Sequence, residues 1–156
     1  MNLFFLDTNP AIAAMQHVDR HVVKMPIELA QMLSTAHHIL DGALAVPGIY
    51  KSAYANHPCS VWVRQSRANY GYALLMLGAL LDEYRHRYGR THGTTKVFLP
   101  LSRLPAGMQT DAFTPPAQAM PEAFQATDPI TAYRGYYRHA KAHLHRWTKR
   151  APPAWL

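Results

Sequence analysis

The sequence contains a single cysteine, Cys59, and no apolar run long enough to cross a lipid bilayer. One cysteine excludes both an internal disulfide and a cysteine-rich zinc site. A transmembrane helix needs about 20 consecutive apolar residues, whereas the longest apolar run, residues 73–81, is followed at once by Asp82 and Glu83. The N-terminal MNLFFLD lacks the basic region of a signal peptide. We therefore expect a cytoplasmic protein with no membrane partner.

The chain is also short of acidic residues. Nine Asp and Glu face sixteen Lys and Arg, which gives a formal net charge of +7, and ten histidines can add positive charge beside phosphate. Such an excess favours a polyanionic partner, above all nucleic acid, although some basic proteins have no such partner. Aromatic residues that suit stacking on nucleotides lie among the basic ones near the C-terminus, namely Tyr133, Tyr136, Tyr137 and Trp147.

The stretch from His17 to Asp41 is an apolar helical pattern with polar side chains set into it. Steps of four, three, four and three residues place five of them on one stripe of a continuous helix, namely His17, His21, Lys24, Glu28 and Gln31. An amine, a carboxylate and imidazoles beside an apolar face indicate a lined cleft. The alternative is a solvated helix face, in which Lys24 and Glu28 form an ion pair worth about 0.3–0.5 kcal/mol.

His17 and His21 also have the spacing of a helical metal-binding pair. The sequence has no companion motif such as HExxH, so we predict neither a metal nor another cofactor.

Proline and glycine divide the chain into three long helical patterns. The first starts at Pro10, is kinked by Pro26 and ends at Asp41-Gly42. After a connector over residues 43–58, the second runs from Cys59 or Ser60 to Tyr88 and is ended by Gly89.

Five prolines break residues 94–127 into a meandering connection with about one short helical turn. Asp128-Pro129 then starts the third helix, which runs to about Lys149, and the tail 151–156 packs back on the domain through its aromatic end. The sequence thus predicts a single compact all-α domain over residues 1–156, with about three long helices and irregular proline-rich connections.

A phosphate site is predicted where the second helix begins. Free backbone amides at a helix start form an anion pocket, and Asn56 and His57 lie directly before this start, although both are also ordinary turn and capping residues. The complete set of predicted nucleic-acid or phosphate contacts is Asn56, His57, Arg64, Arg67, His92, Tyr137 and Lys141.

Three segments together resemble a protein family. These are QHVDRHVVKMPIELAQMLSTAHHILDG, YKSAYANHPCSVWVRQSRANYGYALLMLGALLDEYRHRYGRTH, and AYRGYYRHAKAHLHRW with its Pro-Pro-x-Trp tail. They resemble small phage-encoded proteins labelled pyrimidine-dimer DNA glycosylase or endonuclease V-like, and the similarity covers most of the chain. Endonuclease V itself is more distantly similar, through helix order, a proline in the first long helix and an aromatic-rich end.

The resemblance implies an endonuclease V-like fold that binds duplex DNA, displaces a nucleotide and attacks the sugar C1′ with an amine. The family nucleophile is the N-terminal α-amine, and its acidic partner is a glutamate in the first long helix. Here the amine belongs to Met1, because Asn2 is too large for ready removal of the initiator methionine. Aligning the prolines places Lys24 at the family's glutamate position, and the nearest carboxylate is Glu28, one turn later.

The predicted catalytic set is Lys24, Glu28, His21, His17 and Met1. Apolar neighbours would disfavour the charged form of Lys24 and free its amine for attack. Glu28 opposes this effect but can stabilise an oxocarbenium-like sugar or move a proton, and the histidines can act as general acids or bind phosphate.

The leading hypothesis is an enzyme that acts on a pyrimidine N-glycosidic bond, or on a modified pyrimidine, in DNA or in a nucleotide. Base flipping is expected on duplex DNA. One alternative is an enzyme of phage DNA base modification on the same fold, and another is a non-catalytic nucleic-acid-binding protein. If phage-encoded, the protein would work in the cytoplasm of the infected host. The oligomeric state is left open.

Overall fold

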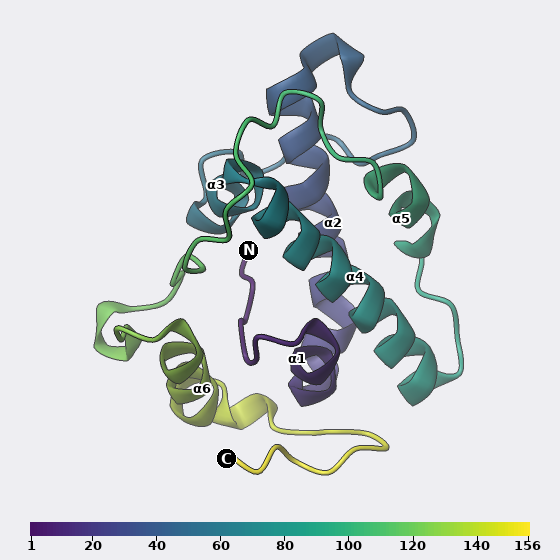
Figure 1. The fold of residues 1–156 in the computed structure, drawn as a ribbon. Helices are drawn as coiled ribbons and strands as arrows, with labels where there is room; N and C mark the ends of the chain where they lie inside the picture. The colour runs from purple at the N-terminus through teal and green to yellow at the C-terminus, as the bar shows by residue number, and fades with distance from the viewer.

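Two long helices, α2 (Asp19–Asp41) and α4 (Arg67–Tyr88), pack against each other at the centre of the molecule. In the computed structural model, which describes all 156 residues, four shorter helices lie around this pair (Figure 1). They are α1 (Pro10–Gln16), α3 (Pro58–Gln65), α5 (Thr95–Leu101) and α6 (Pro129–Ala140), accompanied by short 3₁₀ turns at η1 (Gly42–Leu44), η2 (Glu122–Phe124) and η3 (Ala142–Leu144). There is no strand, so the prediction of a compact all-α domain is confirmed. None of the helices combines the length and apolar character that a membrane crossing requires.

The first predicted helix is divided in two at His17 and Val18. Both residues have extended backbones, with ψ angles of 137° and 155°, so α1 ends before them and α2 begins after them. The side chain of Val18 is fully buried, and this tertiary packing overrides the local helical pattern. α2 then continues through Pro26 and ends at Asp41, and the following Gly42 has a positive φ.

The second predicted helix is also two helices, because Ser66 is extended between α3 and α4. The Ser66 hydroxyl accepts a hydrogen bond from the backbone N–H of Asn69 at 3.1 Å and caps α4. The Asn69 amide in turn donates to the carbonyl of Trp62 at 2.9 Å and ties the two helices together. Gly89 ends α4 in the left-handed conformation, as predicted.

The third predicted helix is shorter than expected. α6 ends at Ala140, and after η3 the chain leaves the helical path and crosses beneath α1 (Figure 1). There the indole of Trp147 donates to the carbonyl of Gln16 at 2.9 Å. The connection over residues 94–127 holds more helix than expected, since it contains the seven-residue α5 and η2 begins just beyond Met120.

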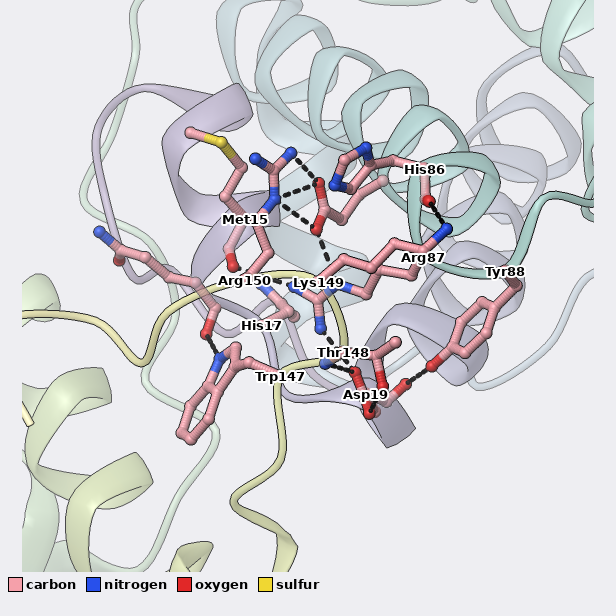
Figure 2. Close-up of polar contacts among 12 residues, drawn as sticks. Met15, His17, Asp19, His86, Arg87, Tyr88, Trp147, Thr148, Lys149 and Arg150 are labelled. Atoms are coloured by element: carbon pink, nitrogen blue, oxygen red, sulfur yellow. Dashed lines mark hydrogen bonds and ion pairs between the residues drawn. The ribbon is translucent and has the colours of Figure 1, made fainter.

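An ion-pair network holds the C-terminal segment to α2 and α4 (Figure 2). Arg87 is buried and binds Glu83 at 2.7 Å and Asp19 at 2.9 Å. Thr148 donates to Asp19 through its backbone N–H and its hydroxyl, and Arg150 pairs with Glu83 at 2.8 Å. Burial acts to raise the pKa of both carboxyls, but these hydrogen bonds outweigh it, and both pKa values are lowered.

The N-terminal segment Leu3–Leu6 runs through the interior between α6 and α4 (Figure 1). Phe4 packs against Tyr137 of α6, with ring centroids 5.2 Å apart, and Phe5 packs against Tyr72 of α4 at 4.8 Å. Cys59 of α3 is buried in the same core, and burial raises the pKa of its thiol to about 12. The beginning of the chain is therefore part of the core, and this determines where its amine lies.

Candidate functional site

The carboxylate of Glu28 lies between two amines. The α-amine of Met1 is 3.8 Å from Glu28 Oε2, and Lys24 Nζ is 2.8 Å from Oε1. Oε2 also accepts the backbone N–H of Asn2 at 3.0 Å. Glu28 itself is only 8% exposed. The structure therefore joins three of the predicted catalytic residues at one carboxylate.

Asn2 fixes the position of the N-terminal amine. Its side-chain oxygen accepts the backbone N–H groups of Leu3 at 2.7 Å and Phe4 at 3.0 Å, and its amide donates to the carbonyl of Ala119 at 2.8 Å. The Met1 side chain is 1% exposed, and its sulfur lies 3.5 Å from the Ser60 hydroxyl. These contacts leave little freedom to the amine before any substrate arrives.

Phe4 has a φ of 43°, in the left-handed region that a bulky residue rarely adopts. Such a conformation costs roughly 1–3 kcal/mol and persists only where the surroundings enforce it. Here the Phe4 ring is buried and stacks on His21 with centroids 4.2 Å apart. The unusual backbone lies two residues after Asn2, whose N–H binds Glu28.

Lys24 differs from the prediction of an amine among apolar neighbours. Its side chain is 67% exposed, so apolar groups do not enclose the amine. It projects into a surface cleft of about 780 Å³. Between the two amines at Glu28, the amine of Met1 is the one that is held in place.

His57 belongs to the same electrostatic neighbourhood. Its Nδ1 accepts the backbone N–H of Cys59 at 3.2 Å, which makes His57 the N-cap of α3. Burial lowers the pKa of His57, the positive N-terminal amine lowers it further, and Glu28 acts in the opposite direction. His57 is therefore neutral at pH 7, close to the amine and the carboxylate, with Asn56 exposed beside it.

His17, His21 and Tyr137 lie beneath this site, within the core. All three are buried, and their rings pack around Phe4 in the aromatic core. His17 Nδ1 donates to the carbonyl of Ala13 at 2.7 Å, and His21 Nδ1 bonds the hydroxyl of Tyr137. The predicted stripe fails at His17 because this residue precedes α2, and the packing of these rings supports the N-terminal segment from below.

Burial lowers the pKa of His17 to about 4 and that of His21 to about 3. Because the folded-state pKa lies below the unfolded value, the unfolded chain binds more protons, and stability falls as the pH falls below about 6.5. We expect each histidine to remove roughly 2 kcal/mol of unfolding free energy between pH 7 and pH 5. The lowered pKa values of Asp19 and Glu83 act only at lower pH.

Urea unfolding at pH 7 and pH 5 tests this expectation. His17→Asn can keep the bond to the Ala13 carbonyl but cannot titrate. Between pH 7 and pH 5 this variant should therefore lose less unfolding free energy than the wild type. His139→Asn, at an exposed position of α6, is the matched control. Equal losses in the wild type and in His17→Asn would contradict the assignment.

Other predicted phosphate contacts are occupied by bonds within the protein. The Arg64 guanidinium donates to the carbonyl of Ala55, and Arg67 pairs with Asp111 at 2.6 Å. His92 is buried, and its two ring nitrogens bind the carbonyl of Val23 and the N–H of Thr94. These three side chains hold loops to helices, so we do not include them in the proposed site.

Lys141, the remaining predicted phosphate contact, lies beside Tyr136 and near His21. Its ammonium lies 4.8 Å from the centroid of the Tyr136 ring, and its charge contributes to the lowered pKa of His21.

The residues that sequence reasoning missed surround Lys24. The cleft beside it is lined by Arg20, also on α2, and by His143, His145 and Arg146 from the segment after α6. Arg20 lies one turn before Lys24, which is a recognisable signal. The other three could not be placed, because the sequence pattern continued the third helix through them.

No cluster of three or more His, Cys, Asp or Glu side chains suited to a metal ion occurs in the structure. Comparisons with family models, with curated proteins and with solved structures found no match to this chain.

Proposed function

We propose that the protein is a DNA glycosylase with lyase chemistry that uses an amine to attack a pyrimidine nucleotide of duplex DNA. The observation that carries this proposal is the α-amine of Met1 held 3.8 Å from the buried carboxylate of Glu28. The net charge of +7 supports a nucleic-acid partner. The resemblance to endonuclease V-like proteins also supports attack by an amine. We propose that the all-α domain has the endonuclease V-like fold.

In the proposed reaction, the unprotonated α-amine attacks C1′ of the deoxyribose, and Glu28 accepts the proton that the nitrogen loses. The glycosidic bond breaks, and the base leaves with the bonding electrons and takes up a proton. The nitrogen lone pair then breaks the C1′–O4′ bond, the ring oxygen takes up a proton, and the opened sugar is held as a Schiff base between Met1 and C1′. A carboxylate beside the attacking amine would also stabilise positive charge as it develops on the sugar.

The α-amine of Met1 is the preferred nucleophile because its position is fixed. A group already held in a productive geometry has less freedom to lose on reaction, and both the side chain of Met1 and the neighbouring Asn2 are anchored. Lys24 extends into the cleft from an exposed position, which suits contact with a phosphate.

Borohydride trapping tests the proposal on duplexes that carry an abasic site, a pyrimidine dimer or a modified pyrimidine. We expect a covalent adduct whose modified peptide contains Met1. Two residues added before Met1 should lower its yield roughly 100-fold or more, because the amine then leaves Glu28. Lys24→Ala should retain the adduct, and the same two residues added after Leu156 are the control.

Other results of the trapping experiment would indicate a different nucleophile or a different function. Loss of the adduct only in Lys24→Ala would move the nucleophile to Lys24, and an adduct only with a modified pyrimidine would favour a role in base modification. The absence of any adduct, together with salt-dependent DNA binding, would refute the amine mechanism.

That last outcome would favour a non-catalytic nucleic-acid-binding protein, a candidate with its own structural support. The bond from the Asn2 N–H to Glu28 anchors the N-terminal segment whether or not chemistry occurs there.

A further inference from the structure

The exposed face of α2 carries two apolar side chains between two basic depressions. Val23 is 45% exposed and Ile27 is 43% exposed, one helical turn apart. Val23 borders the cleft of about 780 Å³ that contains Arg20, Lys24 and Arg146. Ile27 borders a second depression of about 640 Å³ that contains Lys51 and Lys96. We call the surface formed by Val23, Ile27 and the residues that line these two depressions the α2 track.

The charges of the α2 track are almost all positive. Asp19 is its one acidic residue, and Arg87, Thr148 and the largely exposed Arg146 already engage that carboxylate. The α2 residues that line the two depressions extend from Asp19 to Gln31. At 1.5 Å per residue this distance is about 18 Å, which corresponds to about five base-pair steps of 3.4 Å.

The site formed by the α-amine of Met1 and the carboxylate of Glu28 lies on one flank of the α2 track. Lys24 is at the edge of the track, and Glu28, four residues later, is largely covered and faces the N-terminal segment. A nucleotide that stays stacked in a duplex on the track would not reach Glu28. It would have to leave the stack and turn toward that flank.

We propose that duplex DNA docks along the α2 track, and that Val23 and Ile27 enter the base stack where the target nucleotide has left it. The two basic depressions then hold the phosphate backbone before and after that point. Apolar side chains that unstack bases in this way occur in other DNA-binding proteins. The inference rests on the proposed function, because the turned-out nucleotide is the one presented to Met1 and Glu28.

DNA fits the α2 track better than an anionic lipid surface does. Helices that lie on membranes present a broad apolar face of large side chains. Here the large aliphatic side chains that are exposed are Val23 and Ile27, whereas Leu144, Tyr88 and Tyr50 in the depressions are partly buried. The cations lie in concave depressions that can receive the phosphate backbone.

The test compares Val23→Ala/Ile27→Ala with Ile39→Ala in borohydride trapping on an abasic site. Ile39 is 50% exposed on the same helix but outside the α2 track, so it is a matched control. We expect the double variant to trap duplex DNA roughly tenfold more slowly, because unstacking is no longer supported. Trapping on the same site in a single strand should not change, since that strand has no duplex to open.

Equal duplex rates for the double variant and Ile39→Ala would overturn the role of Val23 and Ile27. If wild-type protein traps neither substrate, the proposed function itself fails, and binding data then decide whether DNA uses the α2 track. Arg20→Ala/Lys96→Ala removes one cation from each depression, and the slope of log Kd against log salt should fall by about 2.

Arg90→Ala/Arg103→Ala, at two exposed positions outside the α2 track, is the control for the salt slope. An equal change in the two variants would overturn docking on the track. Binding to phosphatidylglycerol vesicles that is lost in Arg20→Ala/Lys96→Ala, without any effect on DNA binding, would assign the surface to lipid and also overturn the inference.

Discussion

Glu28→Gln is expected to slow covalent trapping by a factor of roughly 10²–10⁴, the usual contribution of a positioned proton acceptor. The amide can still accept the N–H of Asn2, so the N-terminal segment keeps its anchor. What is lost is the negative charge beside the amines of Met1 and Lys24 and the ability to accept a proton. Single-turnover trapping at saturating protein measures the effect directly.

Glu122→Gln is the matched control, because it makes the same charge change at an exposed position on η2. Circular dichroism and thermal unfolding establish whether Glu28→Gln remains folded. A folded variant with a trapping rate within about threefold of the wild type would show that Glu28 only anchors the chain, since a catalytic carboxylate contributes far more.

Arg87→Met is expected to lower the free energy of unfolding by about 3–5 kcal/mol, because it leaves buried carboxylates without their partner. The Arg87 side chain has no exposed surface and donates to Glu83, Asp19 and the carbonyl of Met15. At roughly 2–4 °C per kcal/mol for a chain of this size, Tm should fall by about 6–20 °C. Thermal unfolding at pH 7 measures it.

Arg67→Met tests whether the large loss of unfolding free energy expected for Arg87→Met is due to the burial of its ion pairs. Arg67 pairs with Asp111 at a similar distance, but both side chains are exposed, so its loss should cost below about 1 kcal/mol. Hydrogen exchange of residues 146–150 gives a second readout, since the Arg87 network holds that segment. Equal changes in Tm for the two variants would refute the special role of the buried network.

Local signals in the sequence predicted the helix ends that depend on local chemistry. Asn9 and Asp128 cap α1 and α6 through their own side chains, and Gly89 ends α4 in the left-handed region. The break at Val18 has no comparable signal, whereas Ser66 is itself an N-cap residue that the helical pattern ran through. Val18 is extended because it packs in the core, so a tertiary contact decides that break. At Ser66 the local cap to the N–H of Asn69 acts together with bonds between Thr110 and the residues on either side of the turn.

The candidate site shows the same division. A stripe along one helix groups Lys24 with Glu28, but it cannot tell which of them faces the N-terminus. That depends on the path of Leu3–Leu6 through the core, which brings Asn2 to a residue 26 positions away. Alignment of the prolines placed Lys24 at the family's glutamate position, whereas in the structure the carboxylate beside the α-amine belongs to Glu28.

The buried thiol of Cys59 makes the protein well suited to site-specific labelling. With a pKa near 12 and no exposed surface, its sulfur is protonated and inaccessible at neutral pH. A cysteine introduced at an exposed position, for example by Ile39→Cys, would therefore be the one thiol that reacts with a maleimide dye. Fluorophores or spin labels can thus be attached to α2, outside the α2 track, without replacing any native cysteine.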